Sequence, residues 1–423
     1  MKHRVCLLGI VFVFLTVAGL LVSPLLAQDD ELQPGTAIVL IRMWLFAEAD
    51  TGSDRLVAVA FYEMVTIIEI EGDWAHVEYG DVEGWGRITS NSLVNVDSPP
   101  PLPRGYHRMT YDIESDRVLL FGGATNAFRG PYFTDTWTYE VDTNTWTKME
   151  PEVSPPVGEG PFAYDAQSDR AIMFVGVEME TPFAPLSETW AYDTNTDTWT
   201  NMEPAVAPPG LLGARMAYDA ESDRMILFSG MDSMAYMTDG IFVYINETWA
   251  FDFDSNTWTQ MAPTTSPPPG NYFAMAYDAG ADRVIVTGVV GHEHHDETWL
   301  YDYNMDTWEM REIAESPGAR GYPAIVYATA SDQMILFGGG PFDPPESNEV
   351  DVQDDTWSYD FDSNTWTELH PESFPSARGW HAMAYSTAAD RVILFGGGTD
   401  RKHPTMETWL YDPGANTWTQ MGP

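Results

Sequence analysis

The chain has 423 residues, of which 44% are hydrophobic and 13% aromatic. This composition can fill the cores of two or three domains, which excludes a disordered acidic protein. The formal net charge is -44, with only 20 Lys and Arg residues, so we expect no nucleic-acid partner, because phosphate recognition depends on clustered cations. A cationic partner, a bound divalent metal and simple solubility are all compatible with this charge, and we favour solubility.

The first 27 residues predict a secretory signal peptide. A basic start, Lys2-His3-Arg4, precedes an apolar run over 7–22, and a short stretch ending at Ala27 precedes acidic residues. This order is typical of an export signal cleaved after Ala27. An uncleaved membrane anchor is the alternative, because the run is nearly long enough to cross a bilayer; otherwise we expect no stable membrane span. The only cysteine, Cys6, lies in this segment, so the mature chain has no disulfide. We expect a secreted protein or one on the exterior of the cell envelope.

Residues 28–36 predict an acidic spacer, and residues 37–97 predict a small β-barrel, because short runs rich in β-branched residues alternate with polar or glycine breaks. The stretch around Trp74, followed by Gly84-Trp85-Gly86, resembles the second half of a bacterial SH3-like domain. That resemblance implies binding of cell-wall peptides. A folded spacer is the alternative, because residues 40–44 depart from the first half of that family. Residues 98–103 contain four prolines and predict a stiff linker.

One phrase recurs six times from residue 104 to the end of the chain. It consists of an acidic residue, Thr and Trp, with a second Trp nine positions after the first. The first Trp of each copy lies 50 to 59 residues after that of the preceding copy, and a period of this length indicates a repeat architecture. The tryptophan pairs are Trp137/Trp146, Trp190/Trp199, Trp249/Trp258, Trp299/Trp308, Trp357/Trp366 and Trp409/Trp418.

Each copy also contains a Tyr followed five residues later by Asp, and a hydrophobic run that leads into glycine. Four short strands per repeat predict a four-stranded antiparallel blade, and six blades closed into a ring predict an all-β, six-bladed β-propeller. We place the blades at about 104–149, 150–202, 203–261, 262–310, 311–369 and 370–423. Because the repeat begins with its first strand, we predict that blade 6 packs on blade 1 without exchange of a strand.

Three motifs of the last repeat resemble the kelch repeat. They are Arg378-Gly379-Trp380-His381, Phe395-Gly396-Gly397 and Trp409-Leu410-Tyr411-Asp412, with Trp418 following. The resemblance covers 104–423 and implies a kelch-type propeller. Two enzyme families share such propellers. One is galactose oxidase, whose copper site needs a Tyr cross-linked to Cys, which the mature chain lacks. The other is the group of sialic-acid epimerases, which handle an anionic sugar.

Antiparallel strand order places the 1–2 and 3–4 turns of every blade on one face of the predicted propeller. The 2–3 loops and the blade entrances lie on the other face, which we call the loop face. Two long 2–3 loops, at 231–246 and 340–354, belong to it. Because variable loops on a rigid scaffold commonly hold binding sites, we expect the ligand on the loop face.

Equivalent positions in blades 1, 5 and 6 carry an arginine two residues before an aromatic residue. In this acidic protein, such cations beside aromatic rings suit a carboxylate or a sugar acid. The alternative is blade packing, since the kelch pattern often carries Arg and His at these positions. The candidate ligand-binding residues are Arg104, Tyr106, His107, Arg320, Tyr322, Arg378, Trp380 and His381.

Blade 4 contains a histidine-rich loop, with His292, His294 and His295 among carboxylates. Neutral imidazoles beside carboxylates can bind zinc or copper, and a solvated loop is the alternative. Three of the 3–4 turns, such as the one from Asp252 to Asn256, imitate the start of a calcium loop but lack its glycine and its bidentate glutamate. Tight turns favour the same residues. Apart from such a divalent metal, we expect no cofactor.

The chain contains no nucleophile elbow, P-loop, dinucleotide fingerprint or His-Glu-x-x-His motif. The leading interpretation is an exported, non-catalytic binding or scaffolding protein that recognises an extracellular protein or a carbohydrate through the loop face. The alternative is an enzyme that acts on sugar acids and resembles the kelch-type sialic-acid epimerases, with His107 or His381 as acid or base.

Overall fold

The computed structural model divides the chain into two units, Met1–Leu102 and Pro103–Pro423. It describes residues 10–13, 35–39, 43–47, 49, 53, 55–59, 64–71, 73–79, 82–87, 93–95, 100–125, 130–179, 184–288, 295–340, 352–399 and 403–421. Secondary structure in these residues is almost entirely β, with a single helix, α1 (Ser233–Asp239). The all-β prediction is therefore confirmed.

The N-terminal unit holds an eight-stranded sheet in the order β4-β3-β1-β7-β6-β5-β2-β8. Its strands are β1 (Ile10–Val13), β2 (Gly35–Val39), β3 (Met43–Phe46), β4 (Arg55–Val59), β5 (Met64–Glu71), β6 (Trp74–Tyr79), β7 (Val82–Arg87) and β8 (Leu93–Asn95). In β5, buried Val65 and Ile67 alternate with exposed Thr66 and Ile68, which is the period of two expected of a strand with one buried face.

Two strands of this unit, β6 and β7, carry the tryptophans of the SH3-like stretch. Strands β6 and β7 pair antiparallel, so the Trp74 strand and the Gly-Trp strand lie side by side, and the ring of Trp85 stacks on His76 at 4.8 Å. The SH3-like resemblance stays a prediction. Within the predicted signal peptide, β1 pairs with β3 and β7, so four of these residues belong to the sheet, in keeping with the high β-propensity of Ile-Val-Phe-Val.

Among the described residues, no helix combines the length and the apolar character that crossing a bilayer requires.

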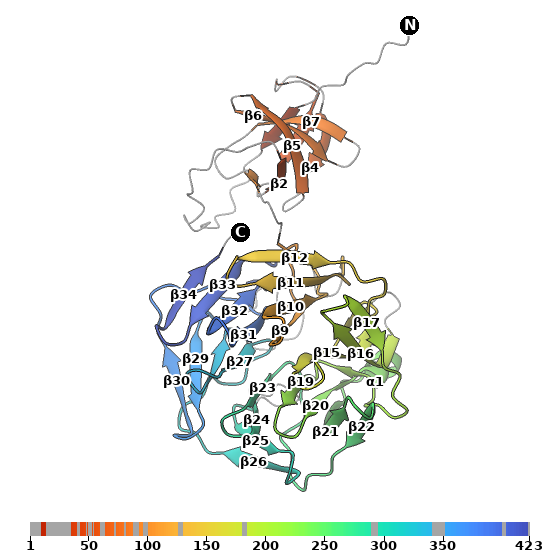
Figure 1. The fold of residues 1–423 in the computed structure, drawn as a ribbon, viewed down its shortest axis with the longest axis vertical. Helices are drawn as coiled ribbons and strands as arrows, with labels where there is room; N and C mark the ends of the chain where they lie inside the picture. Colours follow the sequence, from red (N-terminus) through yellow and green to blue (C-terminus); the bar gives the residue numbers. More distant parts are fainter. Residues whose placement is uncertain are drawn as a thin grey trace. The chain divides into compact units, whose positions relative to one another are not determined.

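The described residues of the unit Pro103–Pro423 form six antiparallel sheets, one for each sequence repeat. Figure 1 shows these sheets arranged around a common axis, as the blades of a propeller. The strands of each sheet follow one another along the chain, and the innermost strands of neighbouring blades contact each other around the axis. The prediction that no strand is exchanged between the ends of the repeat array is confirmed for the described residues.

The blades have four main strands each, and blades 2 and 3 add a short strand, β13 or β18, that pairs with the end of β15 or β20. The first three blades contain β9 (Arg108–Asp112), β10 (Arg117–Phe121), β11 (Thr136–Glu140) and β12 (Thr145–Met149); β13 (Gly158–Glu159), β14 (Phe162–Asp165), β15 (Arg170–Glu178), β16 (Ala184–Asp193) and β17 (Thr198–Asn201); and β18 (Leu211–Leu212), β19 (Arg215–Asp219), β20 (Arg224–Asp232), β21 (Tyr244–Asp252) and β22 (Thr257–Gln260). The last three contain β23 (Ala274–Asp278), β24 (Arg283–Thr287), β25 (Thr298–Asp302) and β26 (Thr307–Arg311); β27 (Ala324–Ala328), β28 (Gln333–Phe337), β29 (Thr356–Asp360) and β30 (Thr365–Leu369); and β31 (Ala382–Ser386), β32 (Arg391–Phe395), β33 (Thr408–Asp412) and β34 (Thr417–Gln420).

The recurring Thr-Trp phrase joins neighbouring blades. In every blade, the indole Nε1 of the second Trp donates a hydrogen bond to the Thr hydroxyl of the preceding blade. The six bonds run from Trp146 to Thr408, Trp199 to Thr136, Trp258 to Thr189, Trp308 to Thr248, Trp366 to Thr298 and Trp418 to Thr356. Because the first of them connects blade 1 with blade 6, the same contact that joins internal blades also closes the ring.

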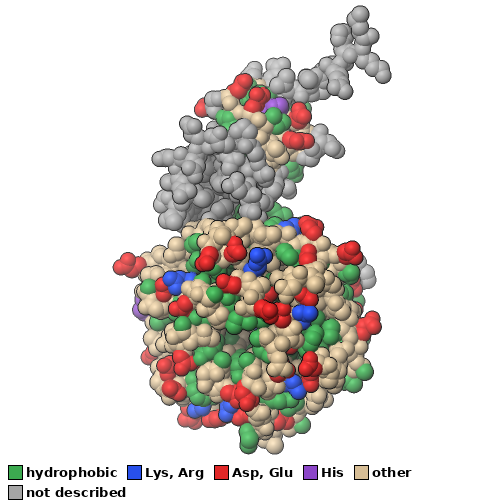
Figure 2. Space-filling view, viewed as in Figure 1, with side chains coloured by type: hydrophobic (Ala, Val, Ile, Leu, Met, Phe, Trp, Pro, Cys, Tyr) green, Lys and Arg blue, Asp and Glu red, His purple; other side chains and the backbone are tan. Residues whose placement is uncertain are grey.

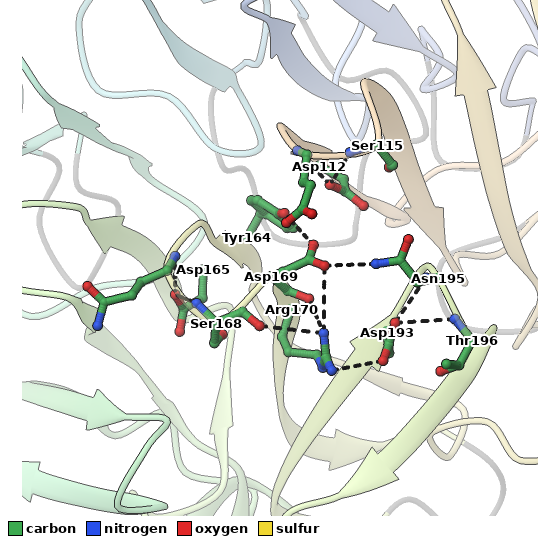
Figure 3. A network of polar contacts seen from close by, with 12 residues as sticks. Asp112, Ser115, Tyr164, Asp165, Ser168, Asp169, Arg170, Asp193, Asn195 and Thr196 are labelled. Carbon is green, nitrogen blue, oxygen red and sulfur yellow. Dashed lines mark hydrogen bonds and ion pairs between the residues drawn. The ribbon is translucent and has the colours of Figure 1, made fainter.

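The Tyr and Asp that recur five residues apart fix the 1–2 turns. In all six blades the Tyr hydroxyl donates to the Asp carboxylate, as Tyr164 does to Asp169 at 2.7 Å. The Asp adopts a left-handed backbone in each case, which Asp and Asn tolerate better than most residues. Figure 3 shows that Arg170, which follows Asp169, reaches Asp193 of the third strand. On the face that carries the 1–2 and 3–4 turns, these carboxylates therefore stabilise the turns.

Candidate functional site

The blade entrances meet on the loop face in a group of aromatic residues. Tyr106, Tyr272, Tyr322 and Trp380 occupy equivalent positions just before the innermost strands of blades 1, 4, 5 and 6, and we call them the entrance cluster. All four have a left-handed backbone, with φ between 56° and 62°, a conformation that disfavours residues with a large side chain. Backbone hydrogen bonds between neighbouring entrances hold it, from the Tyr106 N–H to the Trp380 carbonyl and from the Tyr322 N–H to the Tyr272 carbonyl.

The rings of the entrance cluster pack against one another across the propeller axis. Tyr272 and Tyr322 stack with 4.1 Å between ring centroids. Tyr106 of blade 1 contacts Tyr322 of blade 5 at 5.5 Å, although these blades are not neighbours, and Trp380 lies 5.4 Å from Tyr322. Because Tyr272, Tyr322 and Trp380 are buried, their rings form a small apolar core. They are not an open platform for a ligand, and the prediction that Tyr322 and Trp380 contact one is not supported.

Blades 2 and 3 depart from the aromatic pattern at the same positions. Blade 2 carries Glu159 and blade 3 carries Gly213, whose φ is 73° and where an added Cβ would lie 3.0 Å from the ring of Tyr272. Glycine suits this position because it adopts a positive φ without strain and because a side chain would collide with the ring of Tyr272. The ring of aromatic residues is thus interrupted on one side of the axis, and charged groups lie there.

Four residues from blades 1 to 4 form a polar group beside the entrance cluster, which we call the axial network. Arg108 pairs with the buried Glu159 at 3.1 Å, and Tyr272 donates from its hydroxyl to the other oxygen of Glu159 at 3.3 Å. Arg215 donates from Nε to the Phe273 carbonyl at 2.9 Å, and its guanidinium lies 5.9 Å from the Tyr272 ring centroid. The network contains two cations and one carboxylate, so its net charge is positive.

Burial shifts the pKa values of two residues of the axial network, Arg215 and Tyr272. Burial lowers the pKa of Arg215 to about 10, and the nearby Arg108 adds to this effect while Glu159 opposes it. Burial also raises the pKa of Tyr272 well above its ordinary value, with Glu159 contributing. Arg215 therefore remains charged and Tyr272 remains protonated at neutral pH, so Tyr272 acts as a hydrogen-bond donor to Glu159 and the network keeps its positive charge.

Sequence reasoning missed the axial network. The arginine position singled out in the sequence is that of Arg104, whereas Arg108 and Arg215 stand four residues later in their repeats. Glu159 stands in blade 2 at the position that Tyr106 occupies in blade 1. Alignment of Tyr272 with Tyr106 could have revealed the fourth member of the entrance cluster. No pattern in the sequence indicates that Glu159 reaches both Arg108 and Tyr272.

The structure corrects the prediction for Arg104, Arg320 and Arg378. All three guanidinium groups are buried inside their blades. Each pairs with the acidic residue that precedes Thr-Trp in its own repeat and donates to the carbonyl of a glycine on the same blade. The ion pairs join Arg104 to Asp135, Arg320 to Asp355 and Arg378 to Glu407, at 2.6, 2.7 and 2.5 Å. These arginines therefore serve blade packing, the alternative that the sequence left open.

His107 and His381 are also interior residues. Each ring packs edge-on against a phenylalanine, Phe395 and Phe337 respectively, with centroids 5.5 Å apart. Burial, assisted by the charge of Arg378, lowers the pKa of His381 to about 3, and burial lowers the pKa of His107 well below its usual range. Because both imidazoles are neutral at pH 7 and shielded from water, the prediction that either acts as acid or base is not supported.

The metal predictions have little support in the described part of the chain. His292 and His294 lie outside the described residues, and His295 lies 3.4 Å from Glu297. No group of three or more metal-ligating side chains occurs among the residues that the structure describes. In the calcium-like turn of blade 3, Asp252 pairs with Arg224 at 2.9 Å and accepts from the Ser255 N–H, so its carboxylate stabilises the turn.

The 2–3 loop of blade 3, residues 233–243, exposes a cluster of large apolar side chains on the loop face. It consists of helix α1 and the three residues that follow Gly240. Five of its side chains are between 38% and 55% exposed, and they are Met234, Tyr236, Ile241, Phe242 and Val243. We call this segment the blade-3 loop. A concentration of exposed apolar side chains in one short segment is typical of a binding surface.

Comparisons with known proteins agree with this architecture. Residues 87–211 and 166–397 match the family model of the KLHDC2/KLHL20/DRC7 Kelch-repeats domain. Kelch domain-containing protein 1 of Mus musculus is 22% identical over 268 residues, which cover 59% of this chain and 64% of that protein. A leucine-zipper-like transcriptional regulator 1 homolog of Drosophila melanogaster is 21% identical over 347 residues, covering 78% of this chain and 27% of that protein. The chain thus spans less than two thirds of either relative.

A solved structure, that of YjhT, superposes on this chain with a TM-score of 0.57. The match covers 76% of this chain and 99% of YjhT, at 13% sequence identity. At this identity, the likeness shows that the two chains share a fold.

Proposed function

Because the chain belongs to the kelch-repeat family, we propose that it is an exported, non-catalytic binding protein that uses the loop face of its propeller to recognise another protein. The observation that carries this proposal is the blade-3 loop, which presents five exposed apolar side chains on a scaffold of packed blades. The N-terminal order of basic, apolar and acidic residues supports export.

A protein suits the loop face better than a carbohydrate does. Sugar-binding surfaces need accessible aromatic rings with polar groups around them, whereas the entrance-cluster rings Tyr272, Tyr322 and Trp380 are buried. Protein interfaces favour central Met, Tyr and Phe side chains, and the blade-3 loop offers Met234, Tyr236 and Phe242. The large apolar side chains of the blade-3 loop therefore match a protein partner.

The experiment is site-specific photo-crosslinking in cells that produce the full chain. A photoreactive amino acid replaces Phe242 in the blade-3 loop or, as a control, Met305, which is exposed on a 3–4 turn. We expect a discrete crosslinked protein from position 242 and none from position 305. Absence of a protein adduct at 242, or identical adducts at both positions, would contradict the proposal.

A second candidate function rests on the axial network. Its net positive charge, with Arg215 held near Tyr272, suits the carboxylate of a sugar acid. In this enzyme, Glu159 would transfer protons in place of His107 and His381. This is the enzymatic alternative, an activity on sugar acids like that of the kelch-type sialic-acid epimerases. The test is NMR observation of a panel of sugar acids incubated with the full chain and with Glu159→Gln. Turnover that disappears in E159Q would establish the enzyme, whereas unchanged substrates would support the binding protein.

A further inference from the structure

The blade-3 loop is held in a defined conformation by its flanking residues. The carboxylate of Asp232 caps helix α1 by accepting from the Ala235 N–H at 3.0 Å. The buried Ser233 donates from its hydroxyl to the Gly210 carbonyl at 2.9 Å and contacts the Gly176 carbonyl of blade 2 at 3.1 Å. Gly240 ends the helix in the left-handed conformation. At the other end of the loop, the Val243 carbonyl accepts from the Asp232 N–H at 2.8 Å, and a loop anchored at both ends loses little conformational entropy on binding.

Two of the exposed apolar side chains contact each other on this loop, and the others lie close to them in the chain. The rings of Tyr236, on the helix, and Phe242, after it, lie 5.2 Å apart, and Ile241 and Val243 flank Phe242 in the chain. Within the described residues, no other stretch of ten residues contains five exposed large apolar side chains. Exposure of this kind is unfavourable in water, so a segment that fixes these side chains outward indicates a partner that covers them.

The charged residues in and next to the blade-3 loop in the sequence are all acidic. No Lys or Arg occurs between Arg224 and Arg283. The acidic residues in the loop or beside it in the chain are Asp232, Asp239 and Glu247, and Asp239 is exposed on the loop itself. The other acidic residues of that stretch, from Asp252 on, belong to turns of the opposite face. Figure 2 shows the same imbalance over one face of the propeller, where Asp and Glu side chains are more widespread than Lys and Arg. A partner that covers the apolar centre must therefore accommodate an acidic surround.

Two other occupants fit these charges poorly. A bilayer surface carries anionic lipids, and an acidic segment without Lys or Arg is repelled by them. A second copy of the chain would bring together two surfaces of the same sign within a protein of net charge -44, which is unfavourable for association. A partner with positive charge at its rim satisfies both the apolar centre and the acidic surround.

We infer that the blade-3 loop docks a basic, amphipathic segment of a partner protein, with an apolar stripe over Tyr236, Ile241 and Phe242 and Lys or Arg side chains near Asp239. This inference rests on the proposed function and names the chemistry of the partner. The apolar contact supplies affinity, because large side chains at the centre of an interface carry most of its binding energy. The charges supply orientation and a faster association rate.

The test measures binding of three synthetic helical peptides to the full chain by fluorescence anisotropy. The first peptide has a Leu/Phe stripe and Lys elsewhere, the second replaces Lys by Glu, and the third replaces the stripe by Ser. The loop variant is Ile241→Ser with Phe242→Ser. Its matched control is Ile113→Ser with Met305→Ser, which removes two exposed apolar side chains from turns on the opposite face. All four positions are exposed, and circular dichroism verifies that both variants are folded.

We expect the Leu/Lys peptide to bind the wild type and the control with similar affinity. Its affinity for the loop variant should be lower by a factor of at least about ten. Asp239→Lys should also weaken binding of this peptide, and the Leu/Glu and Ser/Lys peptides should bind poorly. Equal binding to all variants would show attraction by net charge alone and would overturn the inference. Failure of the Leu/Lys peptide to bind the wild type would overturn it as well.

Two further measurements address the competing occupants. Loop-dependent binding to phosphatidylglycerol or phosphatidylcholine vesicles, or loop-dependent dimerisation in analytical ultracentrifugation, would replace the protein segment by a membrane or a second copy. A protein crosslinked through position 242 while the Leu/Lys peptide fails to bind would preserve the proposed function and refute this inference. Failure of both experiments would refute both.

Discussion

Replacement of Thr408 by valine tests how the propeller closes. The Thr408 hydroxyl on blade 6 accepts a hydrogen bond from Nε1 of Trp146 on blade 1 at 3.0 Å, and both side chains are buried. Valine keeps the volume and the branched Cβ of threonine but cannot accept a hydrogen bond. The indole N–H of Trp146 then remains buried without a partner, at the junction between the first and the last repeat.

The magnitude follows from the loss of one partner of a buried pair. An unsatisfied buried donor costs about 1–3 kcal/mol, so we expect Thr408→Val to lower the free energy of unfolding by that amount. The internal pair of Thr248 and Trp308 has the same 3.0 Å separation and the same burial. Thr248→Val should therefore destabilise the protein equally, if closure of the ring uses the same interaction as packing between internal blades.

The assay is urea unfolding of the full chain followed by tryptophan fluorescence, with the change in free energy taken from the midpoint and the slope. Thr419→Val is the control, because Thr419 is exposed, and its effect should stay within about 0.5 kcal/mol. Combining Thr408→Val with Trp146→Phe, which removes the donor, should give a coupling energy of at least about 0.5 kcal/mol. A midpoint for Thr408→Val equal to that of the control, or zero coupling to Trp146, would refute the reasoning.

Four further predictions concern carboxylates. Arg378→Ala should destabilise the protein by about 3 kcal/mol in urea unfolding, because it leaves Glu407 without its cation, and adding Glu407→Gln should restore part of the loss; equal midpoints for the two variants would contradict this. Burial favours a raised pKa for Glu407, but Arg378 outweighs it and holds the pKa below its ordinary value of 4.5, so the stability from this pair should be full at neutral pH and fall as the pH drops below 4.5. Burial raises the pKa of Asp278 above 3.8, so Asp278→Asn should raise the unfolding midpoint at pH 7 and lose that advantage below pH 3.8; a gain that persists in acid would exclude ionisation as the cause. Added calcium should leave the thermal midpoint unchanged, because Asp252 already pairs with Arg224, and a calcium-dependent rise would restore the metal hypothesis.

The propeller was predictable because its repeat contains residues that determine turns and strands through contacts with residues nearby in the sequence. Tyr164 and Asp169 illustrate this, since a left-handed Asp that accepts from a Tyr hydroxyl fixes a tight turn within a few residues. The role of the threonine was not predictable in the same way. Trp199 donates to Thr136, which lies in another repeat, and the spacing of a motif gives its period but not the neighbour that each side chain reaches.

The arginines show where sequence position fails as a guide to a site. Arg104 stands beside an aromatic residue in the chain, and this pattern suits ligand recognition, but the side chain turns into its blade toward Asp135. That carboxylate belongs to the Thr-Trp phrase and was visible in the sequence, yet no local rule pairs it with an arginine 31 residues away. Arg108 and Arg215 were overlooked because their importance depends on Glu159, which a different blade supplies.

Most cations of the propeller form ion pairs within it, and this bears on the charge of the proposed partner. Among the described residues of the propeller, every Lys and Arg except Arg215 forms an ion pair with an acidic side chain of the same unit. The turns use several of these pairs, such as Arg170 with Asp193, to hold strands together. With every described propeller cation except Arg215 in an internal ion pair and a net charge of -44, the chain has a large surplus of carboxylates. Among the described residues, Arg215 of the axial network is therefore the propeller cation without an ion pair to an acidic side chain, and the acidic surface fits the proposal that a partner brings its own positive charge.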